Sequence, residues 1–218
     1  MNLWVLKQEL LKVSYNMNNN LEPKCFSNLK NIFKLLPGVG EKTAERYVFS
    51  LLNINESKIQ EFSKELLNLK ENLSYCEVCG CLIETNKCTV CENNYENNDI
   101  ICVVENFKNV LIFNKTNTFN GKYHVLGGLI SPIDGINPEN INIANLISRV
   151  KKENVKEVIL ALRPGIEGET TSLYIKKVLE KENVKVSKIA QGIPIGTDLE
   201  YIDELTLQLA LNNRKDIS

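Results

Sequence analysis

Two pairs of cysteines lie near the middle of the chain, Cys76 with Cys79 and Cys88 with Cys91. Each pair encloses two residues, and eight residues separate Cys79 from Cys88. Four thiolates presented by two tight turns can form a tetrahedral shell around Zn²⁺, and Gly80 provides the backbone freedom that such a turn needs. Because four thiolates leave no open coordination position, the pattern predicts one structural zinc ion per chain.

Thiol–disulfide exchange is the other chemistry open to a Cys-x-x-Cys pair, but two pairs at this spacing favour a metal site. The chain has seven cysteines and no export signal, which favours metal ligands or free thiols over disulfides. Cys102 lies in an apolar run and is expected in the core, whereas Cys25 and Cys81 are expected as free thiols. Cys81 is too close to Cys79 to replace it comfortably as a ligand. The single histidine, His124, is interpreted as a hydrogen-bonded core or loop residue.

Composition limits the class of protein. A chain of 218 residues with 43% hydrophobic residues can bury a core and form one large or two small domains. It lacks an apolar run of the roughly 20 residues that span a bilayer and a signal-peptide pattern, so we expect a cytoplasmic protein without membrane contact. The net charge of −1 excludes a uniformly basic nucleic-acid-binding protein. Any DNA binding must therefore use a local basic patch.

Such a patch lies in residues 24–46, which contain five lysines and arginines against two glutamates. Apolar residues at helical spacing predict a helix that begins after Ser27 as its N-cap and ends at Pro37. A second helical pattern follows the sequence Gly38-Val39-Gly40. The apolar positions are Leu29, Ile32, Phe33 and Leu36 in the first helix and Ala44, Val48, Leu51 and Leu52 in the second.

This helix–hairpin–helix pattern has a simple chemistry. The glycines allow a sharp turn that exposes N–H groups at the start of the second helix, where the helix dipole favours an anion. Lys42 and Arg46 are four residues apart, so they share one helix face. We therefore predict that Gly38, Val39, Gly40, Lys42 and Arg46 bind DNA phosphates in a salt-sensitive, nearly sequence-independent way. The alternative is an ordinary helical hairpin whose glycines serve only the turn.

A third helix is predicted from Ser57 to about Leu73, and the pattern changes after residue 100. Short apolar runs there predict strands, and amphipathic segments between and after them predict helices, which together indicate an α/β layer with a largely parallel sheet. The third helix should bury Ile59, Phe62, Leu66, Leu69 and Leu73. The predicted strands are 100–104, 110–113, 123–126 and 158–162, and the amphipathic segments are 141–150 and 173–179.

Acidic residues follow two of these strands. Glu105 comes directly after the strand 100–104, and Glu167 and Glu169 come after the strand that ends near Leu162. Working groups in parallel sheets lie at the carboxyl ends of strands, and carboxylates there suit Mg²⁺. The alternative is that Glu167 and Glu169 merely complement the N-terminus of the next helix.

The segment from Arg163 to Glu169 resembles the acidic motif of the Toprim domain, which is shared by topoisomerases, primases and some nucleases. In that motif Asp-x-Asp stands where Arg163 and Gly165 stand here. A guanidinium in place of a metal ligand repels a divalent cation, so metal-dependent phosphoryl transfer is poorly supported. A magnesium-dependent Toprim nuclease or topoisomerase-like enzyme is kept as the alternative function, and a dithiol oxidoreductase as a more distant one.

The order of hairpin, four-cysteine site and depleted Toprim motif is similar to that of the RecR family of bacterial recombination mediators. The resemblance covers roughly residues 24–215. It implies an α+β multidomain protein with a helical helix-hairpin-helix domain, a small four-cysteine zinc finger and an α/β Toprim domain with a mostly parallel sheet. The implied parts are an N-terminal extension and linker at 1–23, the DNA-binding domain at 24–74, the zinc finger at 75–98, the Toprim domain at 99–195 and a subunit-packing segment at 196–218.

The resemblance also implies a function. A RecR-like chain would be a non-enzymatic homo-oligomer, a ring-like tetramer that binds single- or double-stranded DNA. With RecO, and with RecF where present, it would help to load RecA onto gapped DNA coated by single-strand binding protein. Glu105, Glu167 and Glu169 match the residual Toprim acids, for which the resemblance implies partner docking. The chain departs from the family pattern at Asn109 and Asn114, which stand in place of acidic residues, and at Arg163, which stands in place of asparagine.

Overall fold

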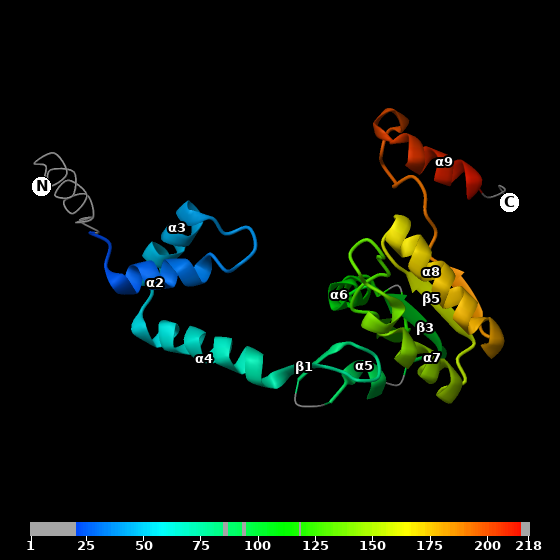
Figure 1. Ribbon diagram of the computed structural model, residues 1–218, viewed down its shortest axis with the longest axis horizontal. Helices are drawn as coiled ribbons and strands as arrows, with labels where there is room; N and C mark the ends of the chain where they lie inside the picture. Colours follow the sequence, from blue (N-terminus) through cyan, green and yellow to red (C-terminus); the bar gives the residue numbers. More distant parts are fainter. Residues whose placement is uncertain (1–20, 85–86, 93–94, 118, 215–218) are drawn as a thin grey trace, which may run out of the picture. The chain divides into compact units, whose positions relative to one another are not determined.

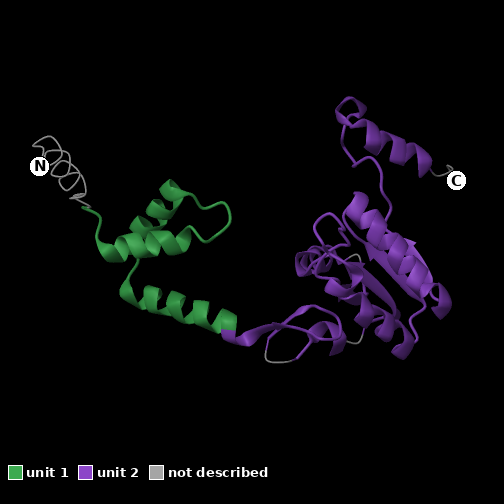
Figure 2. Cartoon of the chain, in the orientation of Figure 1, with its two compact units in different colours: residues 1–70 green, residues 71–218 purple. Residues whose placement is uncertain are grey.

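The computed structural model describes residues 21–84, 87–92, 95–117 and 119–214 (Figure 1). The chain divides into two compact units, residues 1–70 and 71–218 (Figure 2). Most of the predicted extension at 1–23 lies outside the described residues. Within the described ranges, no helix has the length and apolar character needed to cross a membrane.

Unit 1 contains the predicted hairpin, formed by α2 (Lys24–Phe33) and α3 (Glu41–Leu52). The prediction that Ser27 caps the first helix is wrong, because α2 begins at Lys24 and its N-cap is Pro23, four residues earlier. Proline has a fixed φ near the helical value, here −59°, and the Pro23 carbonyl accepts a hydrogen bond from the Ser27 N–H at 3.0 Å. The helix also ends at Phe33, before Pro37, and short turns lead to the glycines.

Aromatic pairs join the two helices of the hairpin. The rings of Phe26 and Phe49 meet edge-on with centroids 5.0 Å apart, and those of Phe33 and Tyr47 meet at 5.5 Å. Such arrangements match the negative face of one ring to the positive edge of the other. Because these contacts fix α3 against α2, they also fix the direction in which the start of α3 points.

Helix α4 (Glu56–Asn72) runs from unit 1 into the first residues of unit 2. The prediction of a buried side on this helix is wrong for the single chain. Phe62, Leu66 and Leu69 are 47%, 54% and 54% exposed. The spacing of these residues is helical as predicted, but no other described element of the chain covers them.

Unit 2 begins with an antiparallel hairpin of β1 (Leu73–Tyr75) and β2 (Leu82–Glu84), followed by the short helix α5 (Thr89–Glu92). A four-stranded sheet follows, in the order β4-β3-β5-β6, and all its neighbouring strands are parallel. This confirms the expected mostly parallel sheet. Its strands are β3 (Asn97–Val104), β4 (Gly121–Val125), β5 (Glu157–Ala161) and β6 (Lys185–Lys188).

The main helices of unit 2 are α6 (Phe107–Thr116), α7 (Ile143–Lys152), α8 (Ile166–Leu179) and α9 (Glu204–Asn212). The predicted strand 110–113 is wrong, because this run lies inside α6. The side chains of Asn106 and Asn109 each accept a hydrogen bond from the other residue's N–H, which forms a capping box, and Asn117 ends the helix in the left-handed conformation. A four-residue apolar run cannot by itself separate a strand from a helix, and these flanking asparagines make it a helix.

The two faces of the sheet carry different apolar clusters. Ile101 and Val103 belong to one cluster together with residues of α7 and α8. Cys102 and Val104 point to the other face. They join a cluster that also contains Cys76, Cys79, Cys81 and Cys88. Successive side chains of a strand point to opposite faces, so β3 separates a conventional helix-covered core from a core built around the cysteines.

Candidate metal centre and nucleic-acid interface

The structure brings the two predicted cysteine pairs together. The ligand atoms of Cys76, Cys79, Cys88 and Cys91 all lie within 4.8 Å of one another. The sulfur atoms of Cys76 and Cys91 are 3.9 Å apart, and those of Cys79 and Cys88 are 3.4 Å apart. A tetrahedral zinc site with Zn–S bonds of about 2.3 Å requires sulfur separations of about 3.8 Å. The four side chains therefore fit a tetrahedral metal ion with only small adjustments.

The turn of the first pair is built by backbone hydrogen bonds. The N–H of Gly80 donates to the carbonyl of Cys76 at 2.8 Å, and the N–H of Cys76 donates to the carbonyl of Cys81 at 2.8 Å. Gly80 has φ +71°, and a Cβ atom there would lie 2.4 Å from the carbonyl oxygen of Val125. Glycine is thus required both by the conformation of the turn and by its close approach to strand β4. The N–H of Val125 in turn donates to the carbonyl of Cys79 at 2.7 Å.

The electrostatics of the sulfur cluster favour a cation. The neighbouring thiol of Cys81 is the main cause that raises the pKa of Cys79, and burial raises the pKa of Cys88 to about 11. The Cys79 sulfur and burial raise the pKa of Cys91, whereas the positive charge of Arg149 lowers it. Crowded, buried thiols resist losing their protons together. A bound dication removes this penalty because it holds all four as thiolates.

The predictions for the other three cysteines are confirmed. Cys102 is 2% exposed in β3, which confirms the core prediction, and Cys25 is an exposed free thiol. Cys81 is also a free thiol, as predicted, but it is fully buried beside Cys79. It is not a member of the four-sulfur cluster. His124 is fully buried and hydrogen-bonds to the carbonyl of Asn142 at 2.7 Å, which confirms the prediction for that residue.

The residual Toprim acids lie at the carboxyl end of the sheet. The chain goes from β3 through α6 to β4 on one side of the sheet, and from β5 through α8 to β6 on the other side. The order of the strands therefore reverses between the neighbouring parallel strands β3 and β5. Glu105 follows β3, Arg163 follows β5, and Arg163 Nε lies 3.6 Å from a carboxylate oxygen of Glu105. The guanidinium of Arg163 therefore lies beside the acid that would otherwise be available to a metal ion.

The other two predicted acids lie in the first turn of α8. Glu169 is half-exposed and forms an ion pair with Lys188 of β6. Glu167 is partly buried and forms no ion pair with the described residues. Two of the three residual acids are thus paired with cations of the same chain. The sequence does not predict the pair with Lys188, because β6 carries no clear strand pattern.

The predicted DNA-contacting residues lie together at the start of α3. Gly38 has φ +79°, which only glycine adopts readily, and Gly40 is the extended N-cap residue of α3. Val39 is half-buried, whereas Lys42 and Arg46 are exposed on α3 and form no ion pair with the described residues. The guanidinium carbon of Arg46 lies 5.8 Å from the centre of the Tyr47 ring, which restricts its side chain.

Other lysines of the basic segment are neutralised within unit 1. Lys30 lies 2.6 Å from Glu22 and 2.8 Å from Glu41, and Lys34 lies 2.6 Å from Glu41. Hydrogen bonds from these two lysines lower the pKa of Glu41 to about 2. Among the described residues of the segment, Lys24, Lys42 and Arg46 form no ion pair, and of these Lys42 and Arg46 lie behind the glycine turn.

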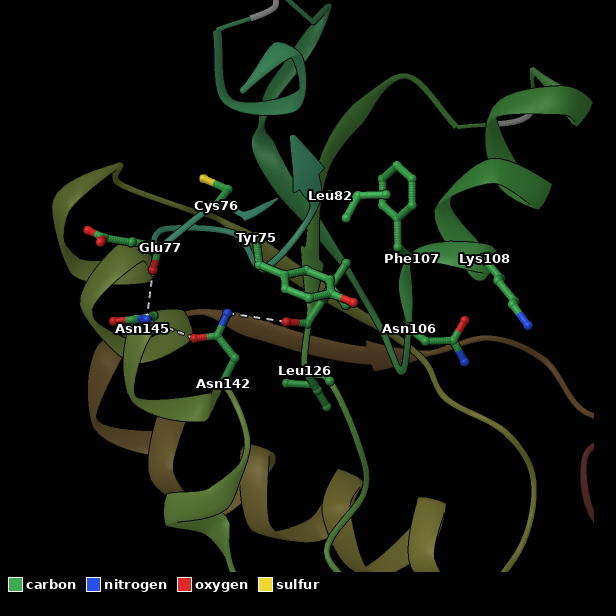
Figure 3. A pocket seen from close by; sticks show the side chains of 13 residues that line it. Tyr75, Cys76, Glu77, Leu82, Asn106, Phe107, Lys108, Leu126, Asn142 and Asn145 are labelled. Carbon is green, nitrogen blue, oxygen red and sulfur yellow. Dashed lines mark hydrogen bonds between the residues drawn. The ribbon is translucent and has the colours of Figure 1, made fainter. Parts of the chain in front are cut away.

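A cavity of about 810 Å³ lies between the cysteine hairpin and the carboxyl ends of β3 and β4 (Figure 3). Tyr75 and Leu82 of the hairpin line one side, and Phe107 of α6 lines another. Figure 3 also shows a chain of hydrogen bonds below Tyr75, in which the Asn145 amide donates to the Glu77 carbonyl and to the side chain of Asn142. No short motif in the sequence marks this cavity, because its lining comes from four separate segments.

Comparisons with known proteins match most of the chain. A family model described as RecR, helix-hairpin-helix, matches residues 26–70, the Toprim domain matches 99–190, and RecR, C-terminal, matches 192–215. Recombination protein RecR of Staphylococcus haemolyticus (strain JCSC1435) is 45% identical over 195 residues, which are 89% of this chain and 98% of the relative. The chain belongs to the RecR family. Recombination protein RecR of Staphylococcus aureus (strain MRSA252) shows the same identity and coverage.

Membership of the RecR family decides between the functions that the sequence left open. RecR proteins are recombination proteins, and the chain is accordingly a recombination mediator and not an enzyme, despite its Toprim domain. The Arg163–Glu105 pair is consistent with this, since a cation next to Glu105 opposes the binding of a metal ion there.

Proposed function

We propose that this RecR-family chain acts in DNA repair by binding single- and double-stranded DNA without sequence preference. Together with RecO, and with RecF where present, it promotes the loading of RecA onto gapped DNA or DNA coated by single-strand binding protein. The observation that carries the proposal is the exposed pair Lys42 and Arg46, which no carboxylate among the described residues neutralises, behind the glycine turn of the RecR hairpin. This role in DNA repair would place the protein in the cytoplasm, where bacterial DNA lies.

The hairpin would bind the DNA backbone. A phosphate at the start of α3 would meet N–H groups of the first turn of the helix, after the Gly38-Val39-Gly40 turn, and the positive end of the helix dipole. Lys42 and Arg46 lie one helical turn apart and would contact phosphates of the same strand. All these contacts are to the backbone, so binding is independent of sequence and weakens as salt increases.

We assign the four-cysteine cluster to one structural Zn²⁺ per chain. Soft thiolates in a closed tetrahedral set favour zinc, and such sites order loops that are too small to fold on a core of their own. When bound, the ion would supply structural cross-linking rather than catalysis. Elemental analysis of the purified protein should give about one zinc per chain; a metal-free protein with disulfides between these cysteines would contradict the assignment.

We propose that the chain forms a homo-oligomer, a ring-like tetramer, that surrounds or adjoins DNA. Exposed apolar side chains on α4 support association in unit 1, and Leu205 and Leu211 of α9, 64% and 59% exposed, support it at the other end of the chain. The proposed segments are those expected from the sequence, with DNA binding at 24–74, the zinc finger at 75–98, the Toprim domain at 99–195 and subunit packing at 196–218.

The residual Toprim acids are proposed to contact a partner such as RecO. Glu167 is the member of this set without an ion pair among the described residues, whereas Glu105 and Glu169 are held by Arg163 and Lys188. Surface ion pairs contribute about 0–1 kcal/mol each, so a basic partner surface can displace them. Arg163 would oppose such a partner through like-charge repulsion and would adjust its affinity.

A RecA-loading assay on single-stranded DNA coated with single-strand binding protein tests the function. We expect the chain and its cognate RecO together to shorten the lag of RecA filament formation and the Lys42→Ala, Arg46→Ala variant to lose this effect. Absence of any acceleration, with or without RecO, would contradict the proposed function. Steady nicking of plasmid DNA by the pure protein would contradict its non-enzymatic part.

A further inference from the structure

Unit 1 has almost no core of its own in the part that the structure describes. Among residues 21–70, only Ala44 and Val48 are buried, and both lie in α3. The other apolar side chains of its helices are half-buried or exposed. A unit of this size needs more buried apolar surface to offset the conformational entropy lost on folding. Another segment is therefore expected to cover part of it.

A groove of about 450 Å³ lies between the end of α3 and the first ten residues of α4. Its apolar lining consists of Leu51 in α3, Ile54 in the turn between the helices, and Ile59 and Phe62 in α4. Ile54 and Phe62 are 44% and 47% exposed. An apolar groove between two helices is suited to the apolar face of a third helix.

The start of the chain has the pattern of such a helix. Leu3, Leu6, Leu10 and Val13 recur at intervals of three, four and three residues, which places them on one face of a helix. This segment lies outside the described residues, so the pattern is that of the sequence alone. It is also additional to the part shared with the relatives, because the family match begins at residue 26 and the aligned part already covers 98% of the Staphylococcus haemolyticus protein.

The chain enters unit 1 close to the groove. Phe26, in the first turn of α2, packs against Phe49 near the end of α3, with ring centroids 5.0 Å apart. Leu51, which lines the groove, follows Phe49 by two residues. Residues 14–23 can span about 33 Å when extended, nearly twice the length of about 18 Å expected for a helix like α3. Residues 3–13 can therefore reach the groove of their own chain.

The charges of the segment and of the groove are opposite. The charged lining of the groove is one lysine and two glutamates, of which Lys58 and Glu61 pair with each other at 2.6 Å. Glu65 accepts a hydrogen bond from Asn68 and forms no ion pair with the described residues. Residues 3–13 contain two lysines and one glutamate. A net positive segment thus faces a net negative groove, which favours their association.

We propose that residues 3–13 form an amphipathic helix that binds in the groove between α3 and α4 of the same chain and completes the core of unit 1. A second copy of the chain is the competing occupant. The tether favours the chain's own segment, because a short linker holds it at an effective concentration of about a millimolar. Leu66 and Leu69, further along α4, do not line the groove and stay available for the proposed contact with a second copy.

Fluorescence of the full-length protein tests this proposal, because Trp4 is the single tryptophan of the chain and adjoins Leu3. A synthetic peptide of residues 1–16 serves as the reference for an unbound segment. We expect the Trp4 emission of the protein to be shifted to shorter wavelength and its quenching constant with acrylamide to be severalfold lower than that of the peptide. Leu10→Glu, which places a charge on the apolar face, should raise the quenching constant to that of the peptide.

Variants of the groove identify the binding site. Ile54→Glu should expose Trp4 as Leu10→Glu does, and Ile54→Ala should have a smaller effect in the same direction. Leu67→Glu is the control, since Leu67 is 65% exposed on α4 and does not line the groove, and it should leave the quenching of Trp4 unchanged. Equal effects of Ile54→Glu and Leu67→Glu would overturn the assignment to the groove.

Limited proteolysis gives a second measurement that keeps the proposal falsifiable if Ile54→Glu folds poorly. Trypsin should cleave after Lys7 and Lys12 severalfold more slowly in the wild-type protein than in Leu10→Glu, because a bound helix resists cleavage. Cleavage at the rate of the free peptide, together with an equally accessible Trp4, would overturn the proposal and leave the groove to a second copy. Protection of Trp4 that disappears when the protein is diluted until its oligomer dissociates would show binding between copies and would overturn binding within one chain.

Discussion

Lys42 and Arg46 differ from Lys30 and Lys34 in having no acidic partner in the described part of the chain. Lys30 and Lys34 are bound to Glu41, so their charge is largely compensated before any DNA arrives. The affinity for DNA should therefore depend on the two residues behind the turn more than on the number of lysines in the segment.

This difference gives a prediction. Replacing Lys42 and Arg46 together by alanine should weaken binding to DNA of every sequence, because it removes two phosphate contacts. It should also make the plot of log affinity against log salt concentration shallower by about two. Fluorescence anisotropy with labelled DNA at several salt concentrations measures both. Lys34→Ala is the control and should change little; an equal effect of the control would contradict a specific role for the pair.

Gly80 is a second residue at which the effect of a substitution on stability can be predicted. A Cβ atom there would lie 2.4 Å from the Val125 carbonyl oxygen, and φ is +71°. We expect Gly80→Ala to lower the free energy of unfolding of the zinc-loaded protein by about 1–3 kcal/mol, the cost usual for a non-glycine residue in a strained conformation. Denaturant unfolding measures it. Gly192→Ala, at a position with no atom within 4 Å of the added Cβ, should be nearly neutral.

At the scale of elements, β4 joins the metal centre to the α/β layer. Its edge groups bind the cysteine loop and α7, and its side chain His124 is fully buried with Nε2 at 2.7 Å from the Asn142 carbonyl. Burial, together with the nearby charge of Arg149, lowers the pKa of His124 to about 4. The imidazole is therefore neutral in the folded protein at pH 7, and the strand tolerates no added charge there.

This burial predicts a pH dependence of stability. The folded pKa of about 4 is below the ordinary value of 6.5, so the unfolded chain binds a proton first as pH falls. The neutral-histidine contribution is fully present above pH 6.5 and is lost progressively from there down to pH 4. Unfolding free energies at pH 7 and pH 5 should differ less in His124→Gln than in wild type. An identical difference in both proteins would contradict the assignment to His124.

At the scale of the whole molecule, an apolar stripe on α4 stays exposed in the single chain. The stripe of Phe62, Leu66 and Leu69 on α4 has the periodicity of a buried helix face, yet about half of each side chain is exposed. In the proposed oligomer, a second copy of the chain would cover this stripe. This would explain why the sequence pattern predicts a buried helix face although the single chain leaves that face exposed.

Association is tested by placing a charge in this stripe. Leu66→Glu should shift the molar mass measured by analytical ultracentrifugation toward that of the 24.7 kDa single chain, because a carboxylate is costly to bury without a partner. Ile133→Glu, at a residue that is 99% exposed and outside the stripe, should leave the mass unchanged. An unchanged mass for Leu66→Glu would exclude α4 from the oligomer interface.

Local sequence patterns predict several structural features of this protein. The two cysteine pairs, the glycine turn with Lys42 and the apolar periodicity of α3 could be read from the sequence because their chemistry depends on neighbours within one or two turns of chain. The dependence on near neighbours in sequence also explains which predictions are wrong. The run 110–113 has the apolar character of a strand, and only the flanking asparagines that cap α6 mark it as a helix. Strand β6 has no clear pattern because it is short and lies at the edge of the sheet.

Only the tertiary structure decided the relations between distant segments. It paired Arg163 with Glu105 across the ends of adjacent strands, buried Arg149 against the edge of β4 and left the α4 stripe uncovered. Burial and charge pairing depend on which segments the fold brings together, and a pattern within one segment holds no information about its partner. The sequence thus determined which groups can do chemistry, and the fold decided which charges remain free to do it.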